Sequence, residues 1–179
     1  FHAMNKILSK EIFLKNKIST PKYFSLKKDE LRENSFTKIL KKKRLSFPII
    51  VKPINEGSSI GVKIIKNLKL LKIEAKNLFK KYEHIMIEEF IPGQEIQVAV
   101  LNDKALGAIE LKPKRKFYDY KAKYNKSAKT QHIMPANINK KSYSEVCKIA
   151  ERVHKIMKCR GVTRSDFKYH NGKFFILEL

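Results

Sequence analysis

The chain has 179 residues, of which 42% are hydrophobic, and this is enough for one packed domain or two small ones. No apolar run approaches the roughly 18 residues of a membrane helix, and the N-terminus has no signal-peptide core, so we expect a cytoplasmic protein with no membrane partner. The 40 Lys and Arg residues outnumber the 17 Asp and Glu residues and give a formal net charge of +23, which makes nucleic-acid binding a first hypothesis.

The positive charge comes mainly from lysines spread along the whole chain. Proteins that read bases concentrate arginine and aromatic residues in one patch, and short runs such as residues 41–44 and 112–116 are typical of solvated faces. We therefore expect nonspecific, salt-sensitive affinity for nucleic acid, with no specific nucleic acid as a partner. A basic nucleic-acid-binding module stays the alternative from another functional class.

The first half of the chain alternates predicted helices and strands. Apolar residues near helical spacing predict a first helix that begins near Met4 and ends before Pro21, where a short extended piece follows. The unbroken apolar run of residues 47–53 is typical of a buried strand, and Asn67 can cap a helix. The further predicted elements are a polar helix over residues 29–43, a strand over 62–65, a helix over 67–81 and a strand over 84–91.

The second half changes to antiparallel hairpins. Asn102 and Asp103 join two predicted strands, residues 95–101 and 104–112, as a two-residue turn would. Residues 114–131 have no apolar periodicity, and a loop of this length is usually functional or disordered. A helix over residues 142–158 and strands over 162–169 and 173–179 complete the pattern. The chain is thus expected to be α/β in its first half and α+β in its second.

Residues 51–61 (VKPINEGSSIG) are the clearest candidate for binding phosphate. Two glycines allow close approach of the backbone, two serines add hydroxyl donors, and Lys52 supplies a cation. The GxxxxGK[ST] spacing of a P-loop is absent and the loop leads from strand to strand, so a nucleotide site here must belong to another architecture. Taken alone, the same residues also fit an ordinary hairpin.

Five further segments accompany this glycine loop in chain order. They are residues 3–6 (AMNK), 87–95 (IEEFIPGQE), 117–124 (FYDYKAKY), 160–167 (RGVTRSDF) and 177–179 (LEL), and residues 130–136 (TQHIMPA) continue the pattern. Together they resemble the D-alanine–D-alanine ligases, which have the ATP-grasp fold. The resemblance implies a central subdomain over residues 1–88 with the glycine loop and a C-terminal catalytic subdomain over residues 89–179, with the nucleotide bound between them.

The resemblance also implies which residues bind ATP. Lys6 and Lys52 would contact phosphates under the Ser58 loop, and the strand up to Ile91 would offer backbone groups to adenine. Glu95 would accept hydrogen bonds from the ribose hydroxyls, although without the resemblance a surface ion pair is the better explanation of this residue. The implied set is Lys6, Lys52, Glu56, Gly57, Ser58, Ser59, Glu88, Glu89, Ile91, Glu95 and Lys123.

Asp166 and Glu178 are the implied ligands of Mg²⁺ or Mn²⁺, because these ions prefer oxygen donors beside phosphates. The two residues flank Asn171 and Gly172, and a plain two-residue turn would place Asp166 opposite Leu177. They share a face only if the connection has an odd residue count or a bulge, so a metal site predicts an irregular turn. Without the family, paired strand charges would be the better explanation.

The resemblance implies four residues with catalytic roles. Arg164 would stabilise the oxyanion of a tetrahedral intermediate from the same face as Asp166. Lys123 would contact the transferring phosphate and Tyr124 would close the substrate pocket as part of a lid over residues 114–131, which we expect to be mobile without ligand. Ser58 completes the set. A lysine- and tyrosine-rich loop that stacks on bases is the alternative.

The implied reaction is the ATP-dependent joining of two D-alanines through an acylphosphate, for peptidoglycan precursor synthesis. The Lys123-Tyr124 pair is more similar to dipeptide-forming enzymes than to D-alanine–D-lactate ligases, which stay an alternative together with other ATP-grasp carboxylate–amine ligases. Full-length members of the family are expected to be homodimers.

The chain departs from the family pattern in four respects. Asn5 stands where an Asp is usual and Lys121 where a Glu is usual, and neither position has an implied contact. The family's N-terminal substrate domain and the Asn two residues after Glu178 have no counterpart. We therefore expect a fragment that binds ATP and lacks the full activity.

Overall fold

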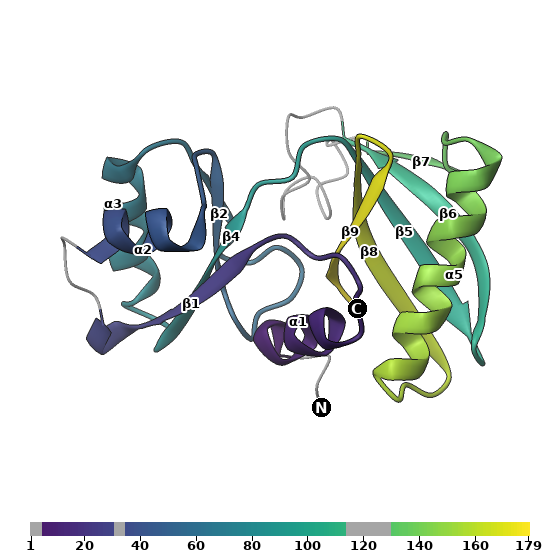
Figure 1. The fold of residues 1–179 in the computed structure, drawn as a ribbon, viewed down its shortest axis with the longest axis horizontal. Coiled ribbons are helices and arrows are strands. Elements are labelled where there is room, and N and C mark those ends of the chain that lie inside the picture. The colour runs from purple at the N-terminus through teal and green to yellow at the C-terminus, as the bar shows by residue number, and fades with distance from the viewer. Residues whose placement is uncertain (1–4, 31–34, 114–129) are drawn as a thin grey trace. The chain divides into compact units, whose positions relative to one another are not determined.

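The computed structural model describes residues 5–30, 35–113 and 130–179. Contacts divide the chain into two compact units, and each contains one antiparallel sheet (Figure 1). The glycine-loop unit runs from Pro21 to Phe90. The hairpin unit joins the N-terminal segment Phe1–Thr20 to Ile91–Leu179.

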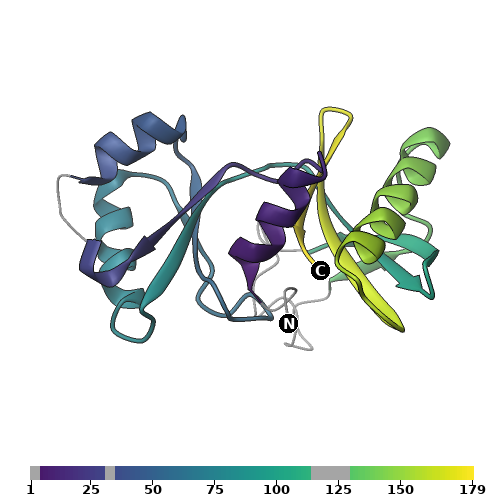
Figure 2. The ribbon, with the colours of Figure 1, turned by 60° about the horizontal axis from the view of Figure 1, so that its bottom comes forward.

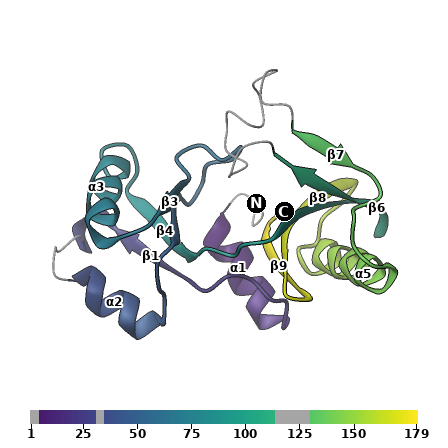
Figure 3. The ribbon, with the colours of Figure 1, turned by 90° about the horizontal axis from the view of Figure 1, so that it is seen from above.

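The glycine-loop unit is a four-stranded sheet with two α-helices on one side (Figure 3). Its strands, in spatial order, are β1 (Tyr23–Lys27), β4 (His84–Glu89), β2 (Ile49–Pro53) and β3 (Lys63–Ile65), and its helices are η2 (Lys28–Glu30), α2 (Ser35–Lys43) and α3 (Leu68–Leu78). Ile49 and Val51 of β2 belong to the core that α2 and α3 cover. Because side chains alternate along a strand, Lys52 lies on the opposite face.

The hairpin unit is a five-stranded sheet with helix α5 on one face. Its strands, in spatial order, are β7 (Gln131–Ile133), β6 (Lys104–Lys112), β5 (Gln94–Leu101), β8 (Val162–His170) and β9 (Lys173–Glu178), and its helices are α1 (Lys6–Lys15) and α5 (Lys140–Ile156). Ile96, Val98 and Val100 of β5 share a core with Val146 and Val153 of α5. The residues between them therefore point to the other face, which carries the charged side chains of the candidate site.

Helix α1 begins with a side-chain cap. The Asn5 side chain accepts hydrogen bonds from the backbone N–H groups of Ile7 and Leu8, at 3.0 and 3.2 Å. Asn and Asp cap helices about equally well, so the departure from the family pattern at this position keeps the helix start.

The units divide the chain differently from the expected segments 1–88 and 89–179. The boundary after Phe90 lies close to the one expected after residue 88. The segment Phe1–Thr20, however, belongs to the hairpin unit. Phe13 and Ile18 lie in the core of that unit, and the Ser19 carbonyl accepts a hydrogen bond from the Ile176 N–H at 2.9 Å. Figure 2 shows α1 beside β9 within this unit.

The expected secondary structure is largely present. Asn102 and Asp103 have φ angles of 47° and 68° and form the predicted two-residue turn, which requires the left-handed region at both positions. The helix expected over residues 29–43 is present as α2 from Ser35 to Lys43, whereas Asp29 and Glu30 lie in the 3-10 helix η2 and residues 31–34 lie outside the described ranges. Strand β7 is unexpected, since three residues are too few to show a period. Within the described ranges, no helix is long and apolar enough to span a bilayer.

Candidate functional site

The ladder between β8 and β9 contains a β-bulge. Asn171 and Gly172, with φ angles of 48° and 74°, form a plain two-residue turn that joins the pair His170–Lys173. Phe167 pairs with Ile176, but the next pair is Asp166 with Glu178, so Leu177 is the extra residue. The turn itself is regular, so the expected irregular turn is wrong. The bulge further along the ladder is what sets the two carboxylates on one face.

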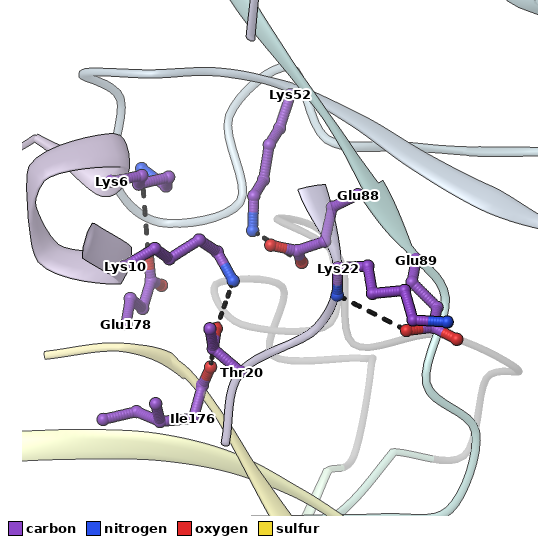
Figure 4. Close-up of polar contacts among 9 residues, drawn as sticks. All are labelled: Lys6, Lys10, Thr20, Lys22, Lys52, Glu88, Glu89, Ile176 and Glu178. Carbon is purple, nitrogen blue, oxygen red and sulfur yellow. Dashed lines mark hydrogen bonds and ion pairs between the residues drawn. The ribbon is translucent and has the colours of Figure 1, made fainter. Parts of the chain in front are cut away.

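Asp166 and Glu178 therefore lie opposite each other on the face away from α5, and each carboxylate has a cation beside it. The Arg164 Nε donates a hydrogen bond to the Asp166 Oδ1 at 3.0 Å; Asp166 is buried, whereas 60% of the Arg164 side chain is exposed. The Lys6 Nζ lies 3.7 Å from the Glu178 Oε2 (Figure 4). The two opposed carboxylates are thus flanked by two cations, and a site for a metal ion and phosphates needs both kinds of group.

The pair of carboxylates fits Mg²⁺ or Mn²⁺. Within the described part of the chain, no cluster of three or more His, Cys, Asp and Glu side chains could hold a metal ion. Mg²⁺ is usually held by one or two carboxylates, with phosphate oxygens and water completing an octahedron. Two opposed carboxylates are thus a suitable donor set for this ion and an insufficient one for a tetrahedral zinc site.

Glu95 of β5 forms an ion pair with Lys168 of β8, with 3.2 Å between the Lys168 Nζ and the Glu95 Oε2. The two residues are register partners, and both side chains are largely buried. Without the resemblance, the sequence favours a surface ion pair for Glu95. The structure has an ion pair there, but it is largely buried. Lys168 is a residue that the sequence interpretation missed. The alternation of β8 would have placed it on the face of Arg164 and Asp166.

Lys52 and Glu88 form a buried ion pair in the glycine-loop unit, with 3.0 Å between the Lys52 Nζ and the Glu88 Oε1 (Figure 4). Lys52 pairs with Met86 across the β2–β4 ladder, so Glu88 is its diagonal neighbour on the same face. An ammonium group has three N–H donors, and one ion pair leaves capacity for phosphate oxygens. Glu88 thus sets the position of the lysine expected to contact phosphate.

The glycine loop consists of consecutive tight turns. Ser58, Ser59 and Gly61 have φ angles of 53°, 61° and 71°, and the Ile60 N–H donates to the Gly57 carbonyl at 3.0 Å. A Cβ atom on Gly61 would lie 2.8 Å from the Pro53 Cγ, so the close approach requires glycine there and the positive φ favours it. Gly57 has open space around its Cα. The backbone near Ser58 is therefore shaped by local turns, as a cradle of N–H groups requires.

Glu56 lies in the glycine loop just before Gly57 and interacts with Tyr82, which follows α3. Burial, and then a hydrogen bond and the negative charge of Glu56, raise the pKa of the Tyr82 hydroxyl above its ordinary value. Tyr82 packs against the core of the glycine-loop unit. It thereby ties the start of the loop to the helical layer.

The segment from Glu89 to Glu95 leads into the hairpin unit. The Glu89 carboxylate accepts a hydrogen bond from the Lys22 backbone N–H at 3.4 Å, and the Glu89 N–H donates to the Lys22 carbonyl at 2.8 Å. Ile91 is buried. Gly93 has a φ of 100°, and a Cβ atom there would lie 2.2 Å from the Tyr169 carbonyl oxygen. This close approach sets the start of β5 and thereby the position of Glu95.

Two expected site residues, Lys123 and Tyr124, lie outside the described residues. The expectation that residues 114–131 form a lid lies there too, except for Thr130 and Gln131. Their roles therefore stay predictions.

Comparisons with known proteins identify the fold. The family model of the "D-ala D-ala ligase C-terminus" matches residues 12–179. A D-alanine–D-alanine ligase of Pelagibacter ubique is 55% identical over 99% of this chain and 57% of its own length. The D-alanine–D-alanine ligase of Bacillus anthracis superposes with a TM-score of 0.83 at 31% identity, over 99% of this chain and 56% of that one. The VanG D-Ala:D-Ser ligase of Enterococcus faecalis superposes with a TM-score of 0.84 at 26% identity, over 99% of this chain and 52% of that one.

The chain spans about half the length of the curated relatives and solved structures that it matches. Its fold is the ATP-grasp fold of these ligases, as the sequence predicts. Because the family model covers nearly the whole chain, the chain belongs to the D-alanine–D-alanine ligase family, and it corresponds to the C-terminal part of that family.

Proposed function

We propose that this chain forms the ATP-binding and metal-binding part of a ligase that joins two D-alanines for peptidoglycan precursor synthesis. The observation that carries the proposal is the bulge at Leu177, which sets Glu178 opposite Asp166. A regular ladder would leave the two carboxylates on opposite faces, where they could not share an ion. Since the reaction consumes ATP, we infer a cytoplasmic location.

Both units carry residues that are proposed to bind ATP. In the glycine-loop unit, Lys52 and the backbone N–H groups near Ser58 would bind phosphate oxygens. In the hairpin unit, Lys6 would bind phosphate and Glu95 the ribose hydroxyls. Mg²⁺ held by Asp166 and Glu178 would neutralise charge on the phosphate oxygens.

The proposed reaction has two steps. In the first, a carboxylate oxygen of one D-alanine attacks the γ-phosphorus of ATP, the bond from that phosphorus to the bridging oxygen breaks, and ADP leaves. In the second, the amine of the other D-alanine attacks the carbonyl carbon of the acylphosphate, a C–N bond forms, phosphate leaves and the nitrogen loses a proton. The guanidinium of Arg164 would stabilise the developing oxyanion, since its side chain is exposed and accessible to a substrate.

We propose D-alanine as the second substrate, as the Lys123-Tyr124 pair suggests. The similarity in fold to the D-Ala:D-Ser ligase VanG means that the backbone alone does not discriminate between second substrates. Such discrimination depends on the few side chains around the attacking group.

Calorimetry with MgATP at physiological salt tests the proposal. We expect the chain to bind MgATP, and we expect Lys52→Met to weaken this binding about tenfold or more, because a hydrogen bond to a charged group contributes about 1.5–3 kcal/mol. Lys63→Met is the matched control, since Lys63 is an exposed lysine on the neighbouring strand. The double variant Lys52→Met/Glu88→Gln avoids leaving a buried carboxylate without its cation.

Two results would overturn the proposal. One is equal MgATP affinity in the Lys52→Met, double and Lys63→Met variants. The other is binding of a DNA oligonucleotide in place of MgATP under the same conditions, which would favour the basic nucleic-acid-binding module, because binding driven by charge alone weakens steeply with salt.

A further inference from the structure

Lys10 is a buried lysine to which the proposed reaction assigns no contact with ATP, metal or substrate. It lies on α1 one turn after Lys6, so the two side chains share a helix face. Its exposed fraction is 0%, whereas lysines are almost never fully buried unless they are paired. A buried ammonium group needs hydrogen bonds to compensate for the loss of water.

A chain of two hydrogen bonds connects Lys10 to strand β9. The Lys10 Nζ donates a hydrogen bond to the Thr20 Oγ1, and the Thr20 hydroxyl donates to the Ile176 carbonyl at 2.8 Å (Figure 4). An ammonium group is only a donor, so Thr20 must accept from Lys10 and has its single proton left for Ile176. Lys10 therefore orients the hydroxyl towards the strand.

Ile176 lies on the edge strand β9, and residues 19–20 bind it from the side away from β8. The Ile176 N–H donates to the Ser19 carbonyl at 2.9 Å, so Ser19 and Thr20 take both backbone polar groups of this residue. Strand β9 is the last strand of the sheet, and this edge would otherwise be unpaired. Residues 19–20 thus continue the sheet at this point.

Ile176 is the last residue before the bulge. Its neighbour Leu177 is the extra residue, and Glu178 follows opposite Asp166. A ladder with one extra residue can slip into the regular register, which would turn Glu178 to the other face. A contact that holds both polar groups of Ile176 opposes this slip.

We propose that Thr20 and Lys10 are positioning residues that hold β9 in its bulged register and thereby direct Glu178 towards the metal ion that it shares with Asp166. The inference rests on the proposed function. Lys6 acts differently, since its ammonium lies 3.7 Å from the Glu178 carboxylate itself. Outer partners of metal ligands commonly change metal affinity by about 10- to 100-fold when they are removed.

Titration of Mn²⁺ by electron paramagnetic resonance, in the presence of ATP, tests the proposal. We expect Thr20→Val, which removes the hydroxyl and keeps the shape, to weaken Mn²⁺ binding about tenfold or more. Thr20→Ser restores the hydroxyl and is expected to keep the affinity of the unaltered chain. Lys10→Met is expected to weaken it in the same direction as Thr20→Val. Thr37→Val, at an exposed threonine of α2, is the matched control.

A second titration separates positioning from folding. ATP affinity without divalent metal is expected to stay within about twofold in Thr20→Val, because the hydrogen bonds from Lys10 through Thr20 to Ile176 act on a metal ligand. An equal loss of metal-free ATP binding would overturn the proposal, since the substitution would then act on the fold. If Thr20→Val does not fold, Lys10→Met and Thr20→Ser decide, and equal Mn²⁺ affinity in these two variants overturns it.

Asp166→Asn distinguishes failure of this inference from failure of the proposed function. Weakened Mn²⁺ binding in Asp166→Asn together with unchanged binding in Thr20→Val would overturn the positioning role and leave the metal site in place. Unchanged binding in both variants would overturn the metal site and the positioning role together.

Discussion

The hairpin unit contains two hairpins of the same construction, β5–β6 and β8–β9, and only the bulge of β8–β9 aligns two carboxylates. Both have a two-residue turn with left-handed backbone at each position, Asn102-Asp103 in β5–β6 and Asn171-Gly172 in β8–β9. Both also have one bulge. In β5–β6 the extra residue is Leu106, which is 59% exposed, and in β8–β9 it is Leu177.

The difference lies in what each bulge brings into register. Beyond Leu106, the bulge sets Gly107 opposite Ala99, and neither residue carries a polar side chain. Beyond Leu177, it sets Glu178 opposite Asp166, beside the guanidinium of Arg164. A bulge therefore sets up a candidate site only through the residues that it aligns. In β8–β9 the Thr20 hydroxyl also donates from outside the ladder to Ile176, the residue before the bulge.

The largest expected effect comes from moving the carboxylate by one position. In the variant Leu177→Glu/Glu178→Leu, composition is unchanged but the carboxylate occupies the bulge in place of the aligned position. We expect Mn²⁺ affinity to fall more than about a hundredfold, since losing a ligand should exceed the loss of an outer partner. The titration described above measures it. Affinity like that of the unaltered chain would mean that the register does not define the site.

Gly172→Ala changes the turn of the β8–β9 hairpin, and we expect an intermediate effect, on the free energy of unfolding. Gly172 has a φ of 74° with no atom within 4 Å of an added Cβ, so only backbone conformation opposes the substitution. We expect a loss of about 1–2 kcal/mol in the free energy of unfolding, measured with denaturant. Gly57→Ala is the control, because Gly57 also has open space and has no positive φ. Equal losses in the two variants would contradict this account of the turn.

The smallest effect is expected at the bulge of the other hairpin. Leu106→Thr exchanges an exposed apolar side chain for a polar one of high strand propensity, and we expect the free energy of unfolding to change by less than about 0.5 kcal/mol. Mn²⁺ and ATP affinities should not change. A large loss of metal binding in Leu106→Thr would remove the contrast between the two hairpins.

Much of the fold follows from local patterns in the sequence. The two turns are marked by Asn102-Asp103 and Asn171-Gly172, and the buried strand β2 by an unbroken apolar run. The sequence also shows what a metal site would need. A regular β8–β9 ladder with a two-residue turn would pair Asp166 with Leu177, so the site needs an irregularity that brings Glu178 opposite Asp166. The sequence does not show that the irregularity is a bulge at Leu177, since ladder register depends on contacts outside the hairpin.

The interactions that local patterns miss join distant residues. Thr20 and Ile176 are separated by 156 positions, and no periodicity links them. For the same reason, the sequence placed α1 with the glycine loop, although Phe13 packs in the core of the hairpin unit. Lys168 could have been found from strand alternation, whereas the pairing of Lys52 with Glu88 requires the order of strands in the sheet.

Anomalous diffraction from crystals of this chain grown with Mn²⁺ and a nonhydrolysable ATP analogue tests the central claim most directly. The account predicts one strong manganese peak in contact with the carboxylates of both Asp166 and Glu178 and with phosphate oxygens of the analogue. A bound analogue with no manganese peak at these two carboxylates would contradict it.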